Sequence, residues 1–323
     1  MNLKEKKMSK WKMILPFWLL LSLISGQSSA QDGSILKTTS VSLSQDIISN
    51  IYEVINKMPN LRFLINDLKK RSENIDISEI TYLSEGLKVK GFLLEPKKDG
   101  TYPCLIINRG GNRNFGIWTK EEVFLLLSTI SHWGYVVVAS QYRGSAGGEG
   151  KEEFGGQDVN DILSLIPLLE SRKKTDAKKI GMLGFSRGGM MTYIAVSKTN
   201  RIKTAVILGG ITDLFSWEKS RPDIKNVFID LIGSDSKSNP DAFKSRSAVF
   251  WPEKISLQNP LLIIHGQADE RVPPTQALNL ASALIEVNQP FRLVTFERAD
   301  HNLTEFWPEW LGMVQDWFKR YLD

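Results

Sequence analysis

The sequence has little of the residue types that most often bind metals or cross-link a chain. Its 323 residues include one cysteine, Cys104, and three histidines, His132, His265 and His301. A single cysteine excludes a disulfide within the chain, and the apolar run around Cys104 predicts a buried structural thiol. One cysteine and three scattered histidines cannot supply a zinc-like cluster of ligands. We therefore expect no metal site and no cofactor.

The sequence also lacks an excess of positive charge once its first residues are set aside. The chain carries 41 Lys and Arg against 36 Asp and Glu, a formal net charge of +5. Residues 1–30 hold five lysines and one glutamate, so they contribute +4 and leave +1 on residues 31–323. A nearly neutral chain gives no indication of binding to nucleic acid or to anionic membranes.

No apolar run near the N-terminus is long enough to predict a membrane-spanning helix. The run at residues 13–24 has 12 residues, whereas a spanning helix needs about 20. It follows five lysines and precedes small residues that end at Ala30, which is the layout of a secretory signal peptide. We expect cleavage after Ala30 and export to the periplasm or the medium, without stable membrane association; an uncleaved membrane anchor is the alternative.

Residues 31–74 are predicted to form a helical N-terminal extension. Between Ser44 and about Arg71 the apolar residues recur at helical spacing. The sequence MPN at residues 58–60 interrupts this spacing, because a proline disfavours helix in the residue before it. Two short helices are therefore expected.

Strand-like and helix-like segments alternate through residues 75–323. Residues 75–83 and 87–94 are typical of a hairpin, and short apolar runs then alternate with helical patterns. This order predicts an α/β fold with a mostly parallel twisted sheet and helices on both faces. The polar segment 211–256 is interpreted as a small cap insertion. Four aromatic residues in it could line a pocket or pack into the core: Trp217, Phe228, Phe250 and Trp251.

A tight turn with a serine at its centre is predicted at residues 184–189, which read GFSRGG. Residues 179–183 resemble a buried strand, and the residues from Met190 onward resemble a helix. A serine flanked by glycines between a strand and a helix is the nucleophile elbow, where there is no room for bulk two residues before or after the serine. This context favours Ser186 as a catalytic nucleophile over a serine in an ordinary turn.

A nucleophilic serine needs a base, and in hydrolases built on this elbow the order is serine, acid, histidine. His132 precedes Ser186 and is interpreted as a surface or capping residue. His265 ends an apolar run and is interpreted as a packed histidine that shapes the next loop. His301 lies on a loop after the strand-like residues 291–296 and is the expected base.

The acid of such a triad should lie on the loop that follows the preceding strand. Residues 265–273, HGQADERVP, offer Asp269 and Glu270, and Asp269 is preferred because it is shorter and closer to the strand. Glu270 and Arg271 are interpreted as a solvated or locally paired face. Asp300 is adjacent to the expected base, but neighbouring residues rarely meet in the needed geometry, so we interpret it as a turn residue.

Several longer segments carry a family resemblance. They are residues 80–91 (ITYLSEGLKVKG), 134–145 (GYVVVASQYRGS), 239–247 (NPDAFKSRS) and 265–273, besides the elbow. From about residue 75 to the C-terminus the chain resembles the catalytic domain of the prolyl oligopeptidase family of serine peptidases, within the α/β-hydrolase fold. The resemblance implies that Ser186, Asp269 and His301 are nucleophile, acid and base.

The resemblance also implies an oxyanion hole. One donor should be the backbone N–H of the residue after the nucleophile, Arg187. Many relatives have His-Gly-Gly-Pro after the first core strand, whereas this chain has Arg-Gly-Gly-Asn at residues 109–112. The N–H of Gly111 is the expected second donor. Arg109 is interpreted either as a group that binds a substrate carboxylate or as a solvated surface charge.

The resemblance predicts a peptidase similar to dipeptidyl or acylaminoacyl peptidases that act on short peptides. Family peptidases usually carry an N-terminal β-propeller, and only residues 31–74 precede the hydrolase core in this sequence. Esterases of the same fold also lack propellers, so a carboxylesterase acting on small acyl esters is the alternative. A non-catalytic binding protein on a hydrolase scaffold is a third hypothesis, although binding alone would not need all three triad residues. The sequence gives no prediction of the oligomeric state.

Overall fold

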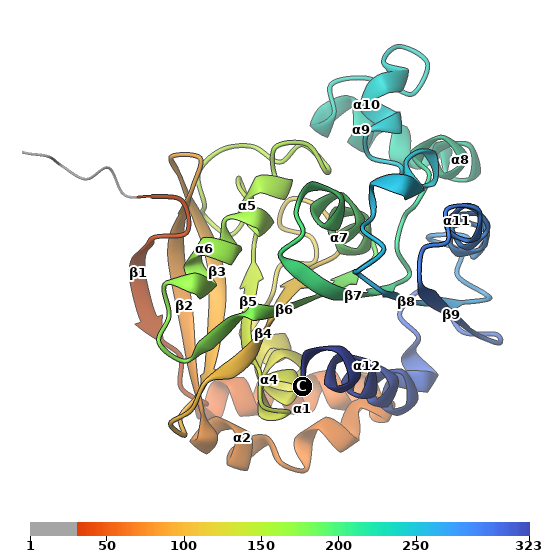
Figure 1. Ribbon diagram of the computed structural model, residues 1–323. Helices are drawn as coiled ribbons and strands as arrows, with labels where there is room; N and C mark the ends of the chain where they lie inside the picture. Colours follow the sequence, from red (N-terminus) through yellow and green to blue (C-terminus); the bar gives the residue numbers. More distant parts are fainter. Residues whose placement is uncertain (1–30) are drawn as a thin grey trace, which may run out of the picture. The chain divides into compact units, whose positions relative to one another are not determined.

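A computed structural model describes residues 31–323, so the predicted signal segment, residues 1–30, lies outside the described residues. The described residues contain a nine-stranded sheet (Figure 1). Its strands are β1 (Ile35–Ser40), β2 (Ile75–Ser84), β3 (Leu87–Pro96), β4 (Tyr102–Asn108), β5 (Val136–Ser140), β6 (Thr175–Phe185), β7 (Ile202–Leu208), β8 (Leu261–Gly266) and β9 (Phe291–Phe296). Their order across the sheet is β1-β2-β3-β5-β4-β6-β7-β8-β9. The pairs β1–β2, β2–β3 and β3–β5 are antiparallel and the others parallel, which confirms the predicted α/β fold.

Helices cover both faces of this sheet (Figure 1). One face packs against α1 (Gln45–Lys57), η1 (Pro59–Ile65), α2 (Leu68–Asn74), the helix formed by α3 (Lys120–Glu122), η2 (Val123–Leu127) and α4 (Ser128–His132), and α12 (Trp307–Leu322). The other packs against α5 (Val159–Leu163), α6 (Leu165–Glu170), α7 (Arg187–Lys198) and α11 (Thr275–Glu286). Successive strand residues therefore belong to different cores, as expected for a strand covered on both sides.

Strand β4 shows this alternation and holds the only cysteine of the sequence. Cys104 and Ile106 join the core on one face, and Leu105 and Ile107 join the core on the other. The Cys104 thiol is fully buried and unpaired, as predicted. Burial raises its pKa to about 12.

The predicted hairpin of β2 and β3 is confirmed, and its two strands are joined by a tight turn. Ser84 pairs with Leu87, so only Glu85 and Gly86 form the turn. Both have positive φ, 49° and 80°. Positive φ at both central residues matches the right-handed twist of the strands that they join.

The prediction of a purely helical extension at residues 31–74 is wrong in one part. Residues 35–40 form β1, an edge strand antiparallel to β2. Five of its six side chains are exposed, so it lacks the alternating apolar pattern that reveals a half-buried strand. The two predicted helical pieces are present as α1 and η1. Their apolar residues, including Ile51 and Leu64, are buried in the same core as Leu105 of β4.

Residues 211–256, predicted as a cap, form several short helices. These are α8 (Leu214–Ser220), η3 (Pro222–Ile224), α9 (Lys225–Leu231), α10 (Pro240–Lys244), η4 (Ala248–Phe250) and η5 (Pro252–Lys254). Trp217, Phe228 and Trp251 are buried, whereas Phe250 is exposed. Within residues 31–323 no helix combines the length and apolar character needed to cross a membrane.

Candidate active site

Ser186 lies between the end of β6 and the first residue of α7, in the turn that the sequence predicted. Its backbone has φ 53° and ψ −119°, a strained conformation for a residue with a side chain. The flanking glycines are required by close packing. A Cβ on Gly184 would lie 2.4 Å from the Gly188 carbonyl oxygen, and one on Gly188 would lie 2.2 Å from the Asn108 oxygen. The local sequence therefore forces the sharp turn that presents the serine.

The loops after β8 and β9 bring Asp269 and His301 together. His301 Nδ1 lies 2.7 Å from Asp269 Oδ2. Because an ionised carboxylate only accepts hydrogen bonds, Nδ1 is the donor and Nε2 is left able to accept a proton. Asp300 instead accepts the backbone N–H groups of Asn302 and Thr304, which is the turn role predicted for it.

Asp269 is held in place by its own loop. Its Oδ1 accepts the backbone N–H groups of Arg271, at 2.9 Å, and Val272, at 2.8 Å. His265 Nε2 donates to the Val272 carbonyl oxygen at 2.8 Å and lies 3.2 Å from Asp269 Oδ2, so His265 does shape the loop that follows it. Burial alone would raise the pKa of Asp269, but the hydrogen bonds from His265, His301 and the loop lower it well below its usual range. Asp269 therefore stays ionised throughout the physiological pH range.

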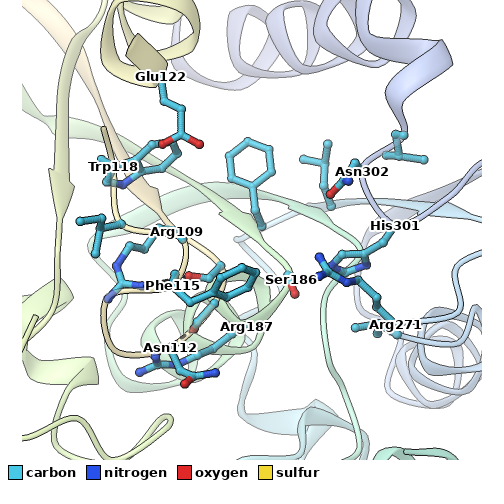
Figure 2. Close-up of a pocket in the computed structure, with 18 of the residues that line it drawn as sticks. Arg109, Asn112, Phe115, Trp118, Glu122, Ser186, Arg187, Arg271, His301 and Asn302 are labelled. Carbon is cyan, nitrogen blue, oxygen red and sulfur yellow. Dashed lines mark hydrogen bonds between the residues drawn. The ribbon is translucent and has the colours of Figure 1, made fainter. Parts of the chain in front are cut away.

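Ser186 and His301 line one cavity of about 780 Å³ (Figure 2). Figure 2 shows the His301 ring beside the serine in this view. Among the described residues no hydrogen bond joins the two side chains, and in enzymes without substrate such bonds are often long. Trp217 and Arg271 contribute to the cavity from the cap and from the loop after β8. Within residues 31–323 no group of three or more His, Cys, Asp or Glu side chains could hold a metal ion.

Two residues next to the nucleophile in space, Arg187 and Gly111, line the cavity and carry the backbone N–H groups expected to form an oxyanion hole. In the described part of the chain, neither Arg187 N nor Gly111 N donates to a protein acceptor. Gly111 has φ +67°, and a Cβ there would lie 2.1 Å from the Phe115 carbonyl oxygen. Only glycine therefore fits this position. A Cβ on the preceding Gly110 would lie 3.2 Å from Ser186 Cβ, so the backbone of this loop approaches the nucleophile closely.

Comparison with known proteins identifies the family. The model described as "Peptidase_S9: Prolyl oligopeptidase family" matches residues 122–323. The uncharacterized peptidase YtmA of Bacillus subtilis is 33% identical over 220 residues, which cover 68% of this chain and 83% of YtmA. The chain belongs to the prolyl oligopeptidase family. It is therefore a hydrolase of the serine peptidase class, as the resemblance predicted.

More distant relatives are longer. Acylamino-acid-releasing enzyme 1 of Oryza sativa subsp. japonica is 25% identical over 266 residues, covering 74% of this chain and 33% of that protein. The solved structure of the Pyrococcus horikoshii acylaminoacyl peptidase superposes with a TM-score of 0.66 at 23% identity, covering 78% of this chain and 43% of the other. The chain thus spans less than half the length of these two proteins, and the structural likeness shows a shared α/β-hydrolase fold.

Arg109, at the start of the glycine loop, fits neither interpretation that the sequence allowed. Arg109 lines the cavity but is only 1% exposed, so it carries no solvated charge, and its guanidinium is already engaged by groups of the protein. Its guanidinium donates to the carbonyl oxygens of Gly110, at 3.1 Å, and Gln141, at 2.8 Å. It also pairs with the buried carboxylate of Glu152 at 2.8 Å, which compensates its charge. Arg109 therefore fixes the loop from inside.

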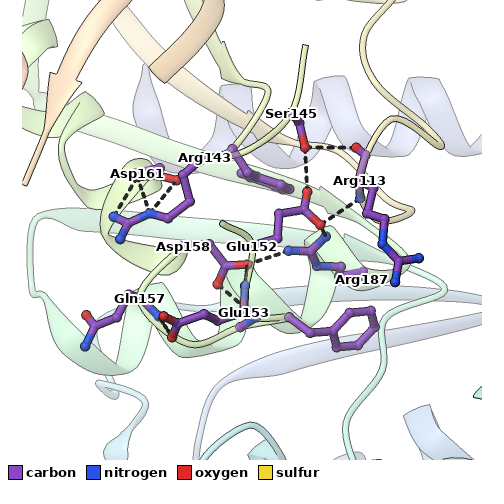
Figure 3. A network of polar contacts seen from close by, with 12 residues as sticks. Arg113, Arg143, Ser145, Glu152, Glu153, Gln157, Asp158, Asp161 and Arg187 are labelled. Atoms are coloured by element: carbon purple, nitrogen blue, oxygen red, sulfur yellow. Dashed lines mark hydrogen bonds and ion pairs between the residues drawn. The ribbon is translucent and has the colours of Figure 1, made fainter. Parts of the chain in front are cut away.

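Glu152 is the centre of a buried polar network beneath the elbow (Figure 3). Its Oε1 accepts from the Arg109 guanidinium at 2.8 Å and from the Ser145 hydroxyl at 2.9 Å. Its Oε2 accepts from the Arg113 backbone N–H at 2.7 Å and from the Arg187 guanidinium at 2.8 Å. One carboxylate thus connects the loop after β4 to the residue next to the nucleophile.

The Arg187 side chain is buried and takes part in this network. It donates to the Gly111 carbonyl oxygen at 3.0 Å and pairs with Asp158 at 2.5 Å. Its Cζ lies 5.1 Å from the centre of the Tyr142 ring. Burial alone would lower the pKa of Arg187, but the Asp158 and Glu152 carboxylates outweigh it and raise the pKa. The guanidinium is therefore permanently charged and bound to the backbone of the glycine loop.

Sequence reasoning did not find Glu152 or Asp158. Both lie in a glycine-rich polar stretch, where a carboxylate is usually exposed. The one usable signal was Arg187 itself, because an arginine at the first turn of a buried helix needs carboxylate partners to compensate its charge.

Replacing Glu152 by glutamine should lower kcat by about 100-fold while changing KM little. Glutamine has the shape of glutamate but cannot accept from all four donors, so the glycine loop and the elbow should shift relative to each other, and misplacements near 1 Å cost about that much. The measurement is steady-state kinetics at a temperature where circular dichroism shows the variant folded. Glu153→Gln, at the next position, is the control and should stay within about twofold. Unchanged kcat in a folded Glu152→Gln protein would show that the network serves stability alone.

Proposed function

We propose that this chain is a serine peptidase that cleaves short peptides with Ser186 as nucleophile, His301 as general base and Asp269 as its acid partner. The observation that carries the proposal is the 2.7 Å contact between His301 and Asp269 at the wall of the cavity that also contains Ser186. Ser186, expected from the tight turn, and the two residues expected from chain order and loop position thus lie on neighbouring loops. Family membership supports the same assignment.

In the proposed mechanism, Ser186 Oγ attacks the carbonyl carbon of the substrate and His301 Nε2 takes its proton. Asp269 holds the imidazole in the required tautomer and stabilises its protonated form. The N–H groups of Arg187 and Gly111 bind the oxyanion of the tetrahedral intermediate. His301 then gives the proton to the leaving group, and water releases the acyl group from the serine by the same steps.

The substrates that we propose are short peptide derivatives of the dipeptidyl or acylaminoacyl type. The names of the rice and Pyrococcus relatives support an acylated or blocked N-terminal residue. The alternative substrate is a small carboxylic ester. Its supporting observation is the large number of Leu, Trp and Phe side chains in the cavity wall, which would bind a plain acyl group well.

The test compares p-nitrophenyl esters with aminoacyl and acyl-aminoacyl p-nitroanilides on the protein that starts at Gln31. A peptidase should release p-nitroaniline from at least one anilide, because amide cleavage uses His301 to protonate a poor leaving group. Brisk hydrolysis of esters without release from any anilide would leave the esterase alternative. If neither the esters nor the anilides were hydrolysed, the result would favour the hypothesis of a non-catalytic binding protein.

A further inference from the structure

The cavity at Ser186 has two walls that belong to different cores. Ile211, Trp217 and Val272 line it on the cap side and are part of the core that includes α7. Leu64, Leu126 and other apolar residues line it on the opposite side and are part of the core that includes α12. We call the space along this second wall the apolar chamber. Ser186 follows the last residue of β6, at the junction of the two sides.

The apolar chamber is built from segments that are far apart in the sequence. Met58, Leu61 and Leu64 come from the N-terminal segment, and Leu125 and Leu126 come from η2. Phe185, directly before the nucleophile, forms edge-to-face contacts with Trp118, at 6.3 Å, and Trp310, at 6.2 Å. A group that reaches from the serine into the chamber would therefore meet aromatic and aliphatic side chains.

Glu122 is an ionisable residue of the chamber wall, and its carboxylate is already engaged by hydrogen bonds. Its carboxylate accepts the Thr119 backbone N–H at 3.0 Å and the Thr119 hydroxyl at 3.3 Å, as part of a helix cap. The cap side differs, because Arg221, Asp223 and Arg271 line it. The chamber is thus the side of the cavity suited to a group without charge.

The N-terminal wall is fixed in place by a buried cation. Arg71, only 4% exposed, donates to the Leu64 carbonyl oxygen of η1 and to the Ser128 hydroxyl of α4 at 3.1 Å. Burial lowers its pKa to about 10, so it stays charged at neutral pH. A buried charge that ties two backbone segments together indicates a wall of defined position.

The helix next to this wall contains a wider turn where it meets the chamber. Residues 123–127 form a π-helical turn within an otherwise α-helical segment, and the successive residues Leu125 and Leu126 both line the cavity. Single π turns inside helices are frequent at functional sites. This second feature again places aliphatic side chains along the path from Ser186.

We propose that the apolar chamber binds an uncharged alkyl or aryl group of the substrate, so that preferred substrates are esters or amides with a medium-length aliphatic chain or an aromatic ring. This inference rests on the hydrolase activity proposed above. It adds a substrate class to that activity, and it makes the N-terminal segment a specificity-determining element.

The first experiment measures kcat/KM for p-nitrophenyl acetate, butyrate, hexanoate and octanoate. The wild-type values should rise by about fourfold per methylene (~0.8 kcal/mol) until the chamber is filled. Met58→Trp, a half-buried position in the chamber wall, should reduce the octanoate-to-acetate ratio at least tenfold. Val227→Trp, half-buried on the cap side, is the matched control and should change all four esters by similar factors.

A parallel series of butyl, hexyl and octyl acetates places the chain on the leaving group instead. A chain-length effect that Met58→Trp removes in either series supports the proposal and tells which side of the scissile bond enters the chamber. A flat dependence in both series, or equal effects of Met58→Trp and Val227→Trp, would overturn it.

A calorimetric titration separates this proposal from the proposed function. 1-Octanol should bind the Ser186→Ala protein, and Met58→Trp in that background should weaken binding at least fivefold. Binding of 1-octanol without turnover of any ester would contradict the proposed hydrolase activity and support the proposed role of the apolar chamber. Turnover of esters without chain-length dependence and without binding of 1-octanol would support the hydrolase activity and contradict the proposed role of the apolar chamber.

Discussion

Replacing Ser186 by alanine should lower kcat by about 10⁴- to 10⁶-fold, the range found when a triad nucleophile is removed. The proposed acyl transfer has no other route, because the hydroxyl oxygen is the atom that attacks the carbonyl carbon. Folding should change little, since among the described residues the Ser186 hydroxyl makes no hydrogen bond and alanine keeps the backbone of the elbow. The measurement is kcat on the best ester or anilide, with melting temperatures for both proteins.

A covalent label gives an independent check. A fluorophosphonate should modify Ser186 in the wild-type protein, and mass spectrometry of its peptides should find no second site. Ser245→Ala, at an exposed position of the cap, is the control and should keep both activity and labelling. If Ser186→Ala retained more than a tenth of the activity, another residue would have to be the nucleophile.

Replacing Asp269 by asparagine should lower kcat by about 10⁴-fold, as the same change does in other serine hydrolase triads. Asparagine would present its NH₂ or a neutral oxygen to His301 Nδ1 and would favour the wrong tautomer. Asp300→Asn is the matched control one position before His301, and it should cost less than tenfold because Asp300 only accepts two backbone N–H groups of a turn. The reverse ranking, in proteins of equal melting temperature, would assign the acid to Asp300.

The wild-type protein and Asp269→Asn should also differ in how their free energy of unfolding depends on pH. The pKa of Asp269 is lowered in the folded protein from its ordinary value of 3.8. The stabilisation from its charge is therefore complete above about pH 4 and is lost as the pH falls toward the folded-state pKa. The difference in free energy of unfolding between wild type and Asp269→Asn should accordingly be largest near neutral pH and shrink in acid.

The turn around Ser186 and the contact between His301 and Asp269 could be expected from the sequence, for different reasons. The elbow around Ser186 could be predicted because two glycines and a strand-to-helix transition lie within a few residues of it. The order serine, acid, histidine then left His301 as the base and directed attention to the loop of Asp269, which the structure places 2.7 Å from that histidine. The turn is constrained by a short stretch of sequence, whereas the choice of His301 and Asp269 follows from the order of residues along the chain.

The parts that were missed depend on pairings across the fold. Arg109 was interpreted as a carboxylate-binding group or a solvated surface charge because nothing nearby in sequence shows that Glu152, 43 positions later, compensates its charge. Strand β1 was missed because an exposed edge strand has no apolar face to reveal it. The chamber wall was missed because Met58 and Leu64 look like ordinary core residues in the sequence, and only the folded chain places them along the cavity that contains Ser186.

The central position of Cys104 gives the protein a reporter of its own unfolding. A thiol reacts as its thiolate, and burial with a pKa of about 12 suppresses that form in the folded chain. Reagents can therefore reach it only when the middle of the sheet opens, at which point the thiol regains an ordinary pKa near 8.5. Because the chain has no other cysteine, the rate of thiol modification reports the opening of the structure at this one position. Variants of the elbow, the network or the chamber can thus be compared in stability under assay conditions, without an added label.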